Sequence, residues 1–115
     1  GSFTIEIEDR TTARFDRAIE SAVYFCCLEA LQNTAKYANA TRATVFLENT
    51  SETLTFTVSD DGSGFDPAAT PQGSGTQGMA DRLAALDGTF SIVSAPGEGT
   101  TVVGDIPAQA SGGGA

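Results

Sequence analysis

Residues 28–37 are LEALQNTAKY, and they place Glu29, Asn33 and Lys36 at positions i, i+4 and i+7 within an apolar stretch. This stretch is part of residues 16–38, which contain no Gly or Pro and repeat apolar residues at helical spacing, so they predict one long helix. At about 100° per residue, the three polar side chains project from the same side of that helix. A solvated last turn explains such a stripe, but Asn is unfavourable inside a helix, so a bound metal ion or phosphate is the other explanation.

Strands on either side of this helix are predicted by the alternation of apolar and polar residues. Residues 3–9 (FTIEIED) predict a half-buried strand, and residues 44–48 and 54–59 predict a hairpin joined by the turn NTSET. Residues 89–107 predict two further strands joined at residues 96–99. The sum is an α+β fold, a two-layer α/β sandwich with one mixed, mainly antiparallel sheet of about five strands and helices on one face.

Asp60 ends the predicted hairpin and is a second candidate for a ligand-binding residue. Alternation places it on the same side as the core-facing apolar residues of its strand. Its carboxylate therefore needs a hydrogen-bond donor, and because the chain has few cations, a ligand amine or amide could be that donor. The following DGSGFD contains Gly62 and Gly64, which allow positive φ and close approach of a ligand to the backbone, although a plain turn explains them equally well.

Two further segments carry weaker signals. Residues 61–78 are rich in Gly, Pro, Ser and Thr and predict a loop, in which Gly73, Gly75 and Gly78 lead into a short helix over residues 79–86. A Gly-rich segment before a helix can direct free N–H groups at an anion, but it is more often only a loop.

The segment GEGTTV opens the last strand with Thr100 and Thr101. The inward-facing residues that follow, Val102 and Gly104, suit a position under a flat ligand.

Composition restricts the class of protein. The 115 residues suffice for one domain, and a formal net charge of -9 with only six Lys and Arg residues argues against a nucleic-acid-binding surface. No apolar run approaches the roughly 20 residues needed to cross a bilayer. Cys26 and Cys27 are adjacent in a helical pattern, so we interpret them as buried thiols in a reducing compartment. Residues 1–2 have the form of an expression scar, residues 3–107 form the domain, and residues 108–115 are expected to be a flexible tail.

Taken in order, these segments resemble the ATP-binding domain of sensor histidine kinases, in the superfamily that includes the gyrase, Hsp90 and MutL ATPases. The resemblance rests on acid-x3-Asn in the long helix, Asp-x-Gly-x-Gly after a hairpin, Gly-x-Gly-x-x-Gly before a short helix, and Gly-Thr before the last strand. It covers residues 3–107, and it implies the Bergerat-type ATP-binding fold. LEALQNTAKYA and GMADRLAALDGTFSIVSAPGEGTTV further resemble the subclass of kinases related to the nitrate and nitrite sensors.

The resemblance implies roles at the phosphate end of a bound ATP. Asn33 would coordinate Mg²⁺ through its side-chain carbonyl, and Glu29 would be either the catalytic base or an orienter of the metal's water shell. Lys36 would approach the phosphates, and Gly75 and Gly78 would meet them.

At the adenine end, the resemblance implies that Asp60 accepts a hydrogen bond from the exocyclic amine. Gly62 and Gly64 would let the base lie against the chain, and Thr100 would help to recognise adenine. Met79 is placed among the nucleotide-binding residues by the same resemblance.

Three positions depart from the subclass pattern. Tyr37 stands where His is common, Thr76 replaces a Leu, and Asp87 with Gly88 replaces a Gly pair. None of these departures removes a principal ligand, so binding is expected to persist. Thr76 is expected to weaken closure of the lid, so the departures bear on turnover more than on binding.

The chain contains no His, so the phosphoacceptor would lie on a separate dimerisation domain of the parent protein, with a response regulator as the next acceptor. We expect the isolated domain to be monomeric and cytoplasmic, in a homodimeric parent that is either membrane-anchored or soluble. The alternatives are an ATPase that uses water as acceptor, a serine kinase that inhibits a sigma factor, and a non-catalytic nucleotide-binding module.

Overall fold

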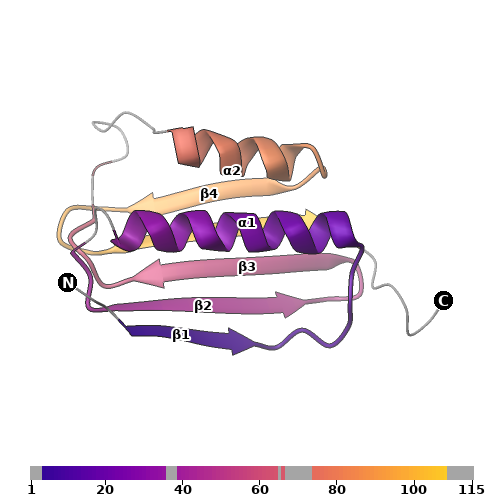
Figure 1. The fold of residues 1–115 in the computed structure, drawn as a ribbon, viewed down its shortest axis with the longest axis horizontal. Coiled ribbons are helices and arrows are strands. Elements are labelled where there is room, and N and C mark those ends of the chain that lie inside the picture. The colour runs from indigo at the N-terminus through magenta and orange to yellow at the C-terminus, as the bar shows by residue number, and fades with distance from the viewer. Residues whose placement is uncertain (1–3, 36–38, 65, 67–73, 109–115) are drawn as a thin grey trace.

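The computed structural model describes residues 4–35, 39–64, 66 and 74–108 (Figure 1). The expected scar at residues 1–2, the site residue Lys36 and most of the expected tail lie outside the described residues. The elements in chain order are β1 (Thr4–Asp9), α1 (Arg17–Asn33), β2 (Arg42–Asn49), β3 (Thr53–Asp60), α2 (Ser74–Ala84), β4 (Thr89–Ser94) and β5 (Thr100–Pro107).

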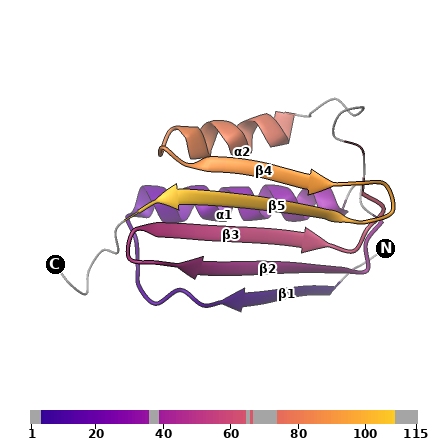
Figure 2. The ribbon, with the colours of Figure 1, turned by 180° about the vertical axis from the view of Figure 1, so that it is seen from behind.

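The five strands form one sheet in the order β1-β2-β3-β5-β4 (Figures 1 and 2). β1 pairs with β2 in parallel, and every other neighbouring pair is antiparallel. Both helices pack on the same face, α1 across β3 and β5 and α2 against β4 and β5. The expected α+β fold with a mixed, mainly antiparallel five-stranded sheet and helices on one face is therefore confirmed.

The core lies between the helices and the central strands. Its largest fully buried side chains come from α1, β3, α2 and β5: Cys26, Phe56, Met79, Leu83 and Ile106. Gly104 of β5 lies under this layer, because a Cβ there would come within 2.2 Å of the Phe56 ring. The space beside Gly104 is thus filled by a protein side chain, and our expectation of a flat ligand at this position is wrong.

β1 is a strand, as its alternation predicts, but it is exposed on both faces instead of half-buried. Its register with Ala43 and Val45 of β2 places Ile5 and Ile7 on the side of the sheet that carries the helices. α1 packs over β3 and β5 and does not extend over this edge strand, so Ile7 remains 68% exposed. Alternation predicts which side chains share a face, but it does not predict whether a second layer covers them.

The boundaries of two segments also differ from expectation. α1 ends at Asn33, and Thr34 and Ala35 continue it as a wider, π-helical turn. Ala108, which we assigned to the flexible tail, is buried, and its N–H donates to the carbonyl oxygen of Glu52 at 2.8 Å. The folded domain therefore includes Ala108.

No helix in the described ranges is both long enough and apolar enough to span a membrane.

The C-terminal end of α2 carries one of the sequence departures. The N–H of Gly88 donates to the carbonyl of Leu83 at 2.7 Å and the N–H of Asp87 to that of Ala84 at 3.0 Å, the pattern of a Schellman cap. Asp87 adopts φ 61°, a left-handed conformation in which Gly is preferred. The Asp at this position therefore stores backbone strain that a Gly pair would avoid.

Replacing Asp87 by Gly is expected to raise the free energy of unfolding by about 0.5–1 kcal/mol, because Gly carries no penalty at positive φ. Urea denaturation of the two proteins measures this difference. The matched control is Gly88→Ala, whose Cβ would lie 2.6 Å from the carbonyl oxygen of Asp105, so this variant should be less stable than the wild type. A loss of stability in Asp87→Gly would contradict the strain assignment.

Candidate nucleotide-binding site

One end of the sheet collects the segments that carry the candidate residues. Strands β3 and β4 end there, β5 begins there, α1 ends there, and α2 points its N-terminal end in the same direction (Figure 1, left). Segments that are far apart in the sequence thus meet because the antiparallel connections return the chain to this end of the sheet.

The side chain of Asp60 points from the end of β3 toward α1, as strand alternation predicts. Its Oδ1 accepts a hydrogen bond from the Gly62 N–H at 2.9 Å, and its Oδ2 lies 3.1 Å from the Thr34 hydroxyl oxygen. The residue is half-buried. A partly buried carboxylate with free lone pairs on both oxygens can accept one more hydrogen bond from a ligand donor.

The neighbouring Asp61 has a different role. It is exposed, and its carboxylate accepts hydrogen bonds from the Thr41 hydroxyl at 2.6 Å and from the N–H groups of Thr41 and Arg42 at 2.8 and 2.9 Å. The Thr41 hydroxyl first, and then these N–H groups, lower the pKa of Asp61 to about 2. Asp61 therefore fixes the segment after β3 to the start of β2.

Gly64 adopts φ 64°, but the reason differs from our expectation. A Cβ on Gly64 would lie 2.1 Å from the carbonyl oxygen of Ala95, in the turn between β4 and β5. Gly99 has φ 73°, and its Cβ would lie 2.2 Å from the carbonyl oxygen of Asp60. Both positions require Gly because two backbones approach closely, and this contact fixes Asp60 relative to the last strand. Gly62 does not share the positive φ.

Thr100 lies directly opposite Asp60 in the pairing of β3 with β5. Opposite residues of an antiparallel pair project to the same face, so the Thr100 side chain lies beside the carboxylate. Its hydroxyl oxygen is 2.9 Å from that of Ser94, which donates to the carbonyl of Gly99. No sequence pattern singles out Ser94, because Ser is common in the turns that follow strands.

Glu29 and Asn33 lie on adjacent turns of α1 and are both half-buried. They continue the stripe begun by Phe25, which contacts α2. Their oxygens suit Mg²⁺, which binds few protein oxygens and retains several waters. In the part of the chain that the structure describes, no group of three or more His, Cys, Asp or Glu side chains could hold a metal ion.

α2 begins at Ser74, five residues earlier than we expected, so Gly75 and Gly78 lie within the helix instead of before it. Each Gly costs about 1 kcal/mol in a helix interior, which the burial of Met79 and Leu83 in the core outweighs. A Cβ on Gly78 would lie 3.8 Å from the Phe25 ring. Gly78 therefore lies at the contact between α2 and α1.

The Arg82 guanidinium lies over the same ring, 3.8 Å from its centroid, and strengthens this contact by a cation–π interaction. Met79, by contrast, is fully buried, and its carbonyl lies 3.9 Å from the Cys26 sulfur. A fully buried side chain cannot touch a ligand without a rearrangement, and the assignment of Met79 to nucleotide binding stays a prediction.

The thiols do not provide a second reactive group. Cys26 and Cys27 are free, and burial raises their pKa to about 11 and about 12. Both remain protonated at neutral pH, so neither is a nucleophile. Cys26 is fully buried, as interpreted from the sequence, whereas Cys27 is half-buried.

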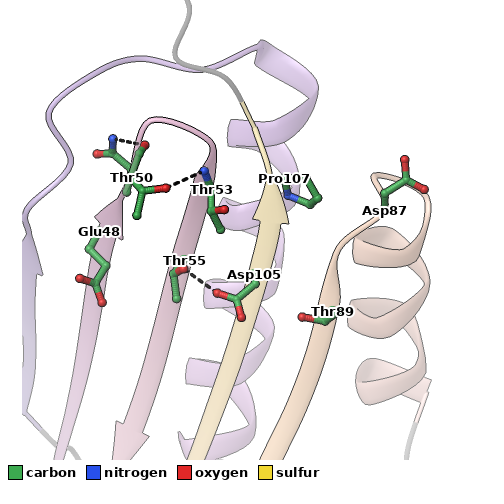
Figure 3. A pocket seen from close by; sticks show the side chains of 9 residues that line it. Glu48, Thr50, Thr53, Thr55, Asp87, Thr89, Asp105 and Pro107 are labelled. Atoms are coloured by element: carbon green, nitrogen blue, oxygen red, sulfur yellow. Dashed lines mark hydrogen bonds between the residues drawn. The ribbon is translucent and has the colours of Figure 1, made fainter.

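A hollow of about 560 Å³ lies at the opposite end of the sheet, on the face without helices (Figure 3). It is lined by hydroxyls of Thr53, Thr55 and Thr89 and by the carboxylates of Glu48, Asp87 and Asp105. None of the candidate residues lines it. Three carboxylates would repel the phosphates of a nucleotide, so this hollow is not the nucleotide site.

Comparisons with known proteins agree with the fold. Residues 18–110 match the family described as histidine kinase-, DNA gyrase B-, and HSP90-like ATPase. The chain is 38% identical over 95 residues to the signal transduction histidine-protein kinase/phosphatase DegS of Brevibacillus brevis, covering 82% of this chain and 25% of DegS. It is 42% identical over 66 residues to the protein of the same description, UhpB, of Salmonella typhimurium, covering 57% of this chain and 13% of UhpB.

Two solved structures share the fold. The histidine kinase domain of the blue-light activated histidine kinase of Erythrobacter litoralis has a TM-score of 0.75 at 23% identity, covering 93% of this chain and 55% of that chain. The mycobacterial sensor histidine kinase MprB has a TM-score of 0.67 at 20% identity, covering 92% of this chain and 83% of that chain.

The fold and the family match together define an ATPase-type domain, and the chain belongs to the family of histidine kinase-, DNA gyrase B- and HSP90-like ATPases. It spans about a quarter of the length of DegS and less of UhpB. The finer assignment to kinases related to the nitrate and nitrite sensors stays a prediction.

Proposed function

We propose that this chain is the ATP-binding catalytic domain of a two-component sensor histidine kinase. In this function it transfers the γ-phosphoryl group of ATP to a His on a separate dimerisation domain of its parent protein, from which the group passes to an Asp of a response regulator. The similarity to DegS and UhpB supports the kinase class. The observation that carries the proposal is the arrangement of the Asp60 carboxylate and the Asn33 and Glu29 side chains on segments that meet at one end of the sheet.

At the adenine end, Asp60 accepts a hydrogen bond from the exocyclic amine of the base. Two protein donors already orient its carboxylate, and Thr100 lies beside it in register. The backbone at Ser63 and Gly64 packs against the turn between β4 and β5. A carboxylate accepts hydrogen bonds but does not donate them, so this site favours an amino group over a carbonyl oxygen at the same position of the purine.

At the phosphate end, Asn33 and Glu29 would hold Mg²⁺, which would supply positive charge to neutralise the charge that develops during transfer. Lys36, which lies outside the described residues, is assigned to the phosphates by the resemblance of its motif. The N-terminal turn of α2, which includes Gly75, would offer backbone N–H groups and the positive end of a helix dipole to the phosphates. Gly78 is the fifth residue of α2, so its N–H is not among the four free ones.

These residues would act by positioning the reacting groups. The bond between the γ-phosphorus and the bridging oxygen of ADP breaks while a ring nitrogen of the acceptor His forms the new bond, and the protein orients the two in line. Glu29 would orient water or accept the proton of the attacking group.

The proposal predicts that the isolated chain binds ATP but forms no phosphohistidine, because it contains no His. Transfer should appear when the His-bearing domain of the parent is added in trans. It should be slow, because two separate domains lack the effective concentration that a covalent linker provides. Incubating γ-labelled ATP and Mg²⁺ with the chain, with the His-bearing domain, and with both, and then testing the label for acid lability, measures this.

Acid-labile label on the isolated chain would overturn the proposal. Acid-stable label on a hydroxyl of a supplied partner would instead support a serine kinase. ATP binding without any transfer to the parent's His-bearing domain would support a non-catalytic nucleotide-binding module.

A further inference from the structure

Thr34 is the one polar side chain that is buried among the residues that the structure describes, with 4% of its surface exposed. It follows Asn33 directly and lies one turn after the buried Ala30, so it faces the core and not the solvent. No sequence pattern singles out Thr34. A buried hydroxyl needs a hydrogen-bond partner, and the identity of that partner indicates what Thr34 does.

Two acceptors lie at the same distance from the Thr34 hydroxyl. The Oδ2 atom of Asp60 is 3.1 Å away, and the carbonyl oxygen of Ala30 is also 3.1 Å away. One hydroxyl proton can serve only one of them. The carboxylate is the stronger acceptor, and the Ala30 carbonyl already accepts the backbone N–H of Thr34. The Thr34 hydroxyl is therefore taken to donate its hydrogen bond to the Asp60 carboxylate.

The Asp60 carboxylate is thereby held by donors from two separate segments. The Thr34 hydroxyl reaches one oxygen from α1, and the Gly62 N–H reaches the other from the segment after β3. Two donors on the two oxygens determine the rotation of the carboxylate plane, whereas a single donor leaves it free to turn. The lone pairs left open then have fixed directions.

We propose that Thr34 is a positioning residue for base recognition: its hydroxyl orients Asp60 so that the carboxylate accepts the hydrogen bond of a purine amino group, and it thereby increases the preference for adenine nucleotides. This inference rests on the proposed function, because it presupposes that Asp60 binds the amine.

The test compares ATP with purine riboside triphosphate, which lacks only the exocyclic amine. Calorimetry is carried out on the wild type, on Thr34→Val, which removes the hydroxyl and keeps the branched shape, and on Thr34→Ser, which keeps the hydroxyl. Thr34→Val should weaken ATP binding about fivefold, because the carboxylate loses one of the two donors that orient it, and leave the des-amino analogue within about twofold. Thr34→Ser should match the wild type with both ligands.

Variants at Asp60 separate positioning from general damage. In the background of Asp60→Asn, Thr34→Val should have no further effect on the ratio of the two affinities, because the group it orients is no longer a carboxylate. If Thr34→Val does not melt cooperatively, Thr34→Ala tests the same prediction with a smaller side chain.

Equal loss of affinity for both ligands in Thr34→Val would overturn the proposal and reduce Thr34 to a structural residue. An unchanged ratio with unchanged affinities would overturn it as well. A wild type that binds ATP and the des-amino analogue equally well would defeat the assignment of the amine to Asp60, and with it both proposals at this end of the site. Failure of the positioning role of Thr34 alone is therefore distinguishable from failure of the proposed function.

Discussion

Replacing Asp60 by Asn is expected to weaken ATP binding by a factor of about 10 to 150, which corresponds to the 1.5–3 kcal/mol typical of a hydrogen bond to a charged group. The amide presents one acceptor and one donor group where the carboxylate presents two acceptors, so one of the three bonds at this position is lost or reversed. The fold should persist, because Asp60 lies at the end of β3 and outside the hydrophobic core. Calorimetry measures the affinity, and thermal unfolding checks the fold.

Asp61→Asn is the matched control, since the two acids are adjacent in the chain but contact different groups. The Asp61 carboxylate binds the start of β2 and not the side of the sheet that carries α1. Its pKa of about 2 lies below the ordinary value of 3.8, so its contribution to stability is present above pH 4 and is lost as the pH falls through about 2.

Asp61→Asn should therefore lower stability at neutral pH, and the difference from the wild type should shrink as the pH approaches 2. Its affinity for ATP should equal that of the wild type. Equal affinities of Asp60→Asn and the wild type would defeat the assignment of adenine to this end of the sheet.

Strand alternation predicted the geometry of Asp60 because the period of a strand is exactly two residues and leaves no freedom of face. The register of β3 with β5 then places Thr100 opposite Asp60, and opposite residues share a face of the sheet. The exposure of β1 could not be predicted in this way, since it depends on where α1 crosses the sheet. Local patterns specify faces, while tertiary packing decides which faces are covered.

The start of α2 was misplaced for a related reason. Gly75 and Gly78 weaken helix propensity, so composition favours a loop up to Met79. In the structure, the burial of Met79 and Leu83 outweighs this local preference. Gly64 was expected in a turn, but the neighbour that excludes a side chain there, Ala95, is 31 residues away in the sequence and could not be identified from it.

Replacing Asn33 by Ala is expected to lower phosphoryl transfer to the parent's His-bearing domain by about 100-fold or more, the size of effect typical of removing one preorganised electrostatic group. The side-chain oxygen of Asn33 is assigned to the metal and not to the base. ATP affinity should therefore fall in the presence of Mg²⁺ and change by no more than about twofold when the metal is chelated. Nucleotide titrations with and without Mg²⁺, together with transfer rates, measure the two effects separately.

Asn33→Asp and Gln32→Ala are the comparison variants for this experiment. Asp keeps an oxygen ligand at the same position, so Asn33→Asp should retain more of the metal-dependent affinity than Asn33→Ala. Gln32 is the preceding residue of α1 and is exposed, so Gln32→Ala should behave as the wild type. Equal losses of affinity in Asn33→Ala with and without Mg²⁺ would mean that Asn33 supports the end of α1 and holds no metal, because only a metal ligand makes its contribution through the ion.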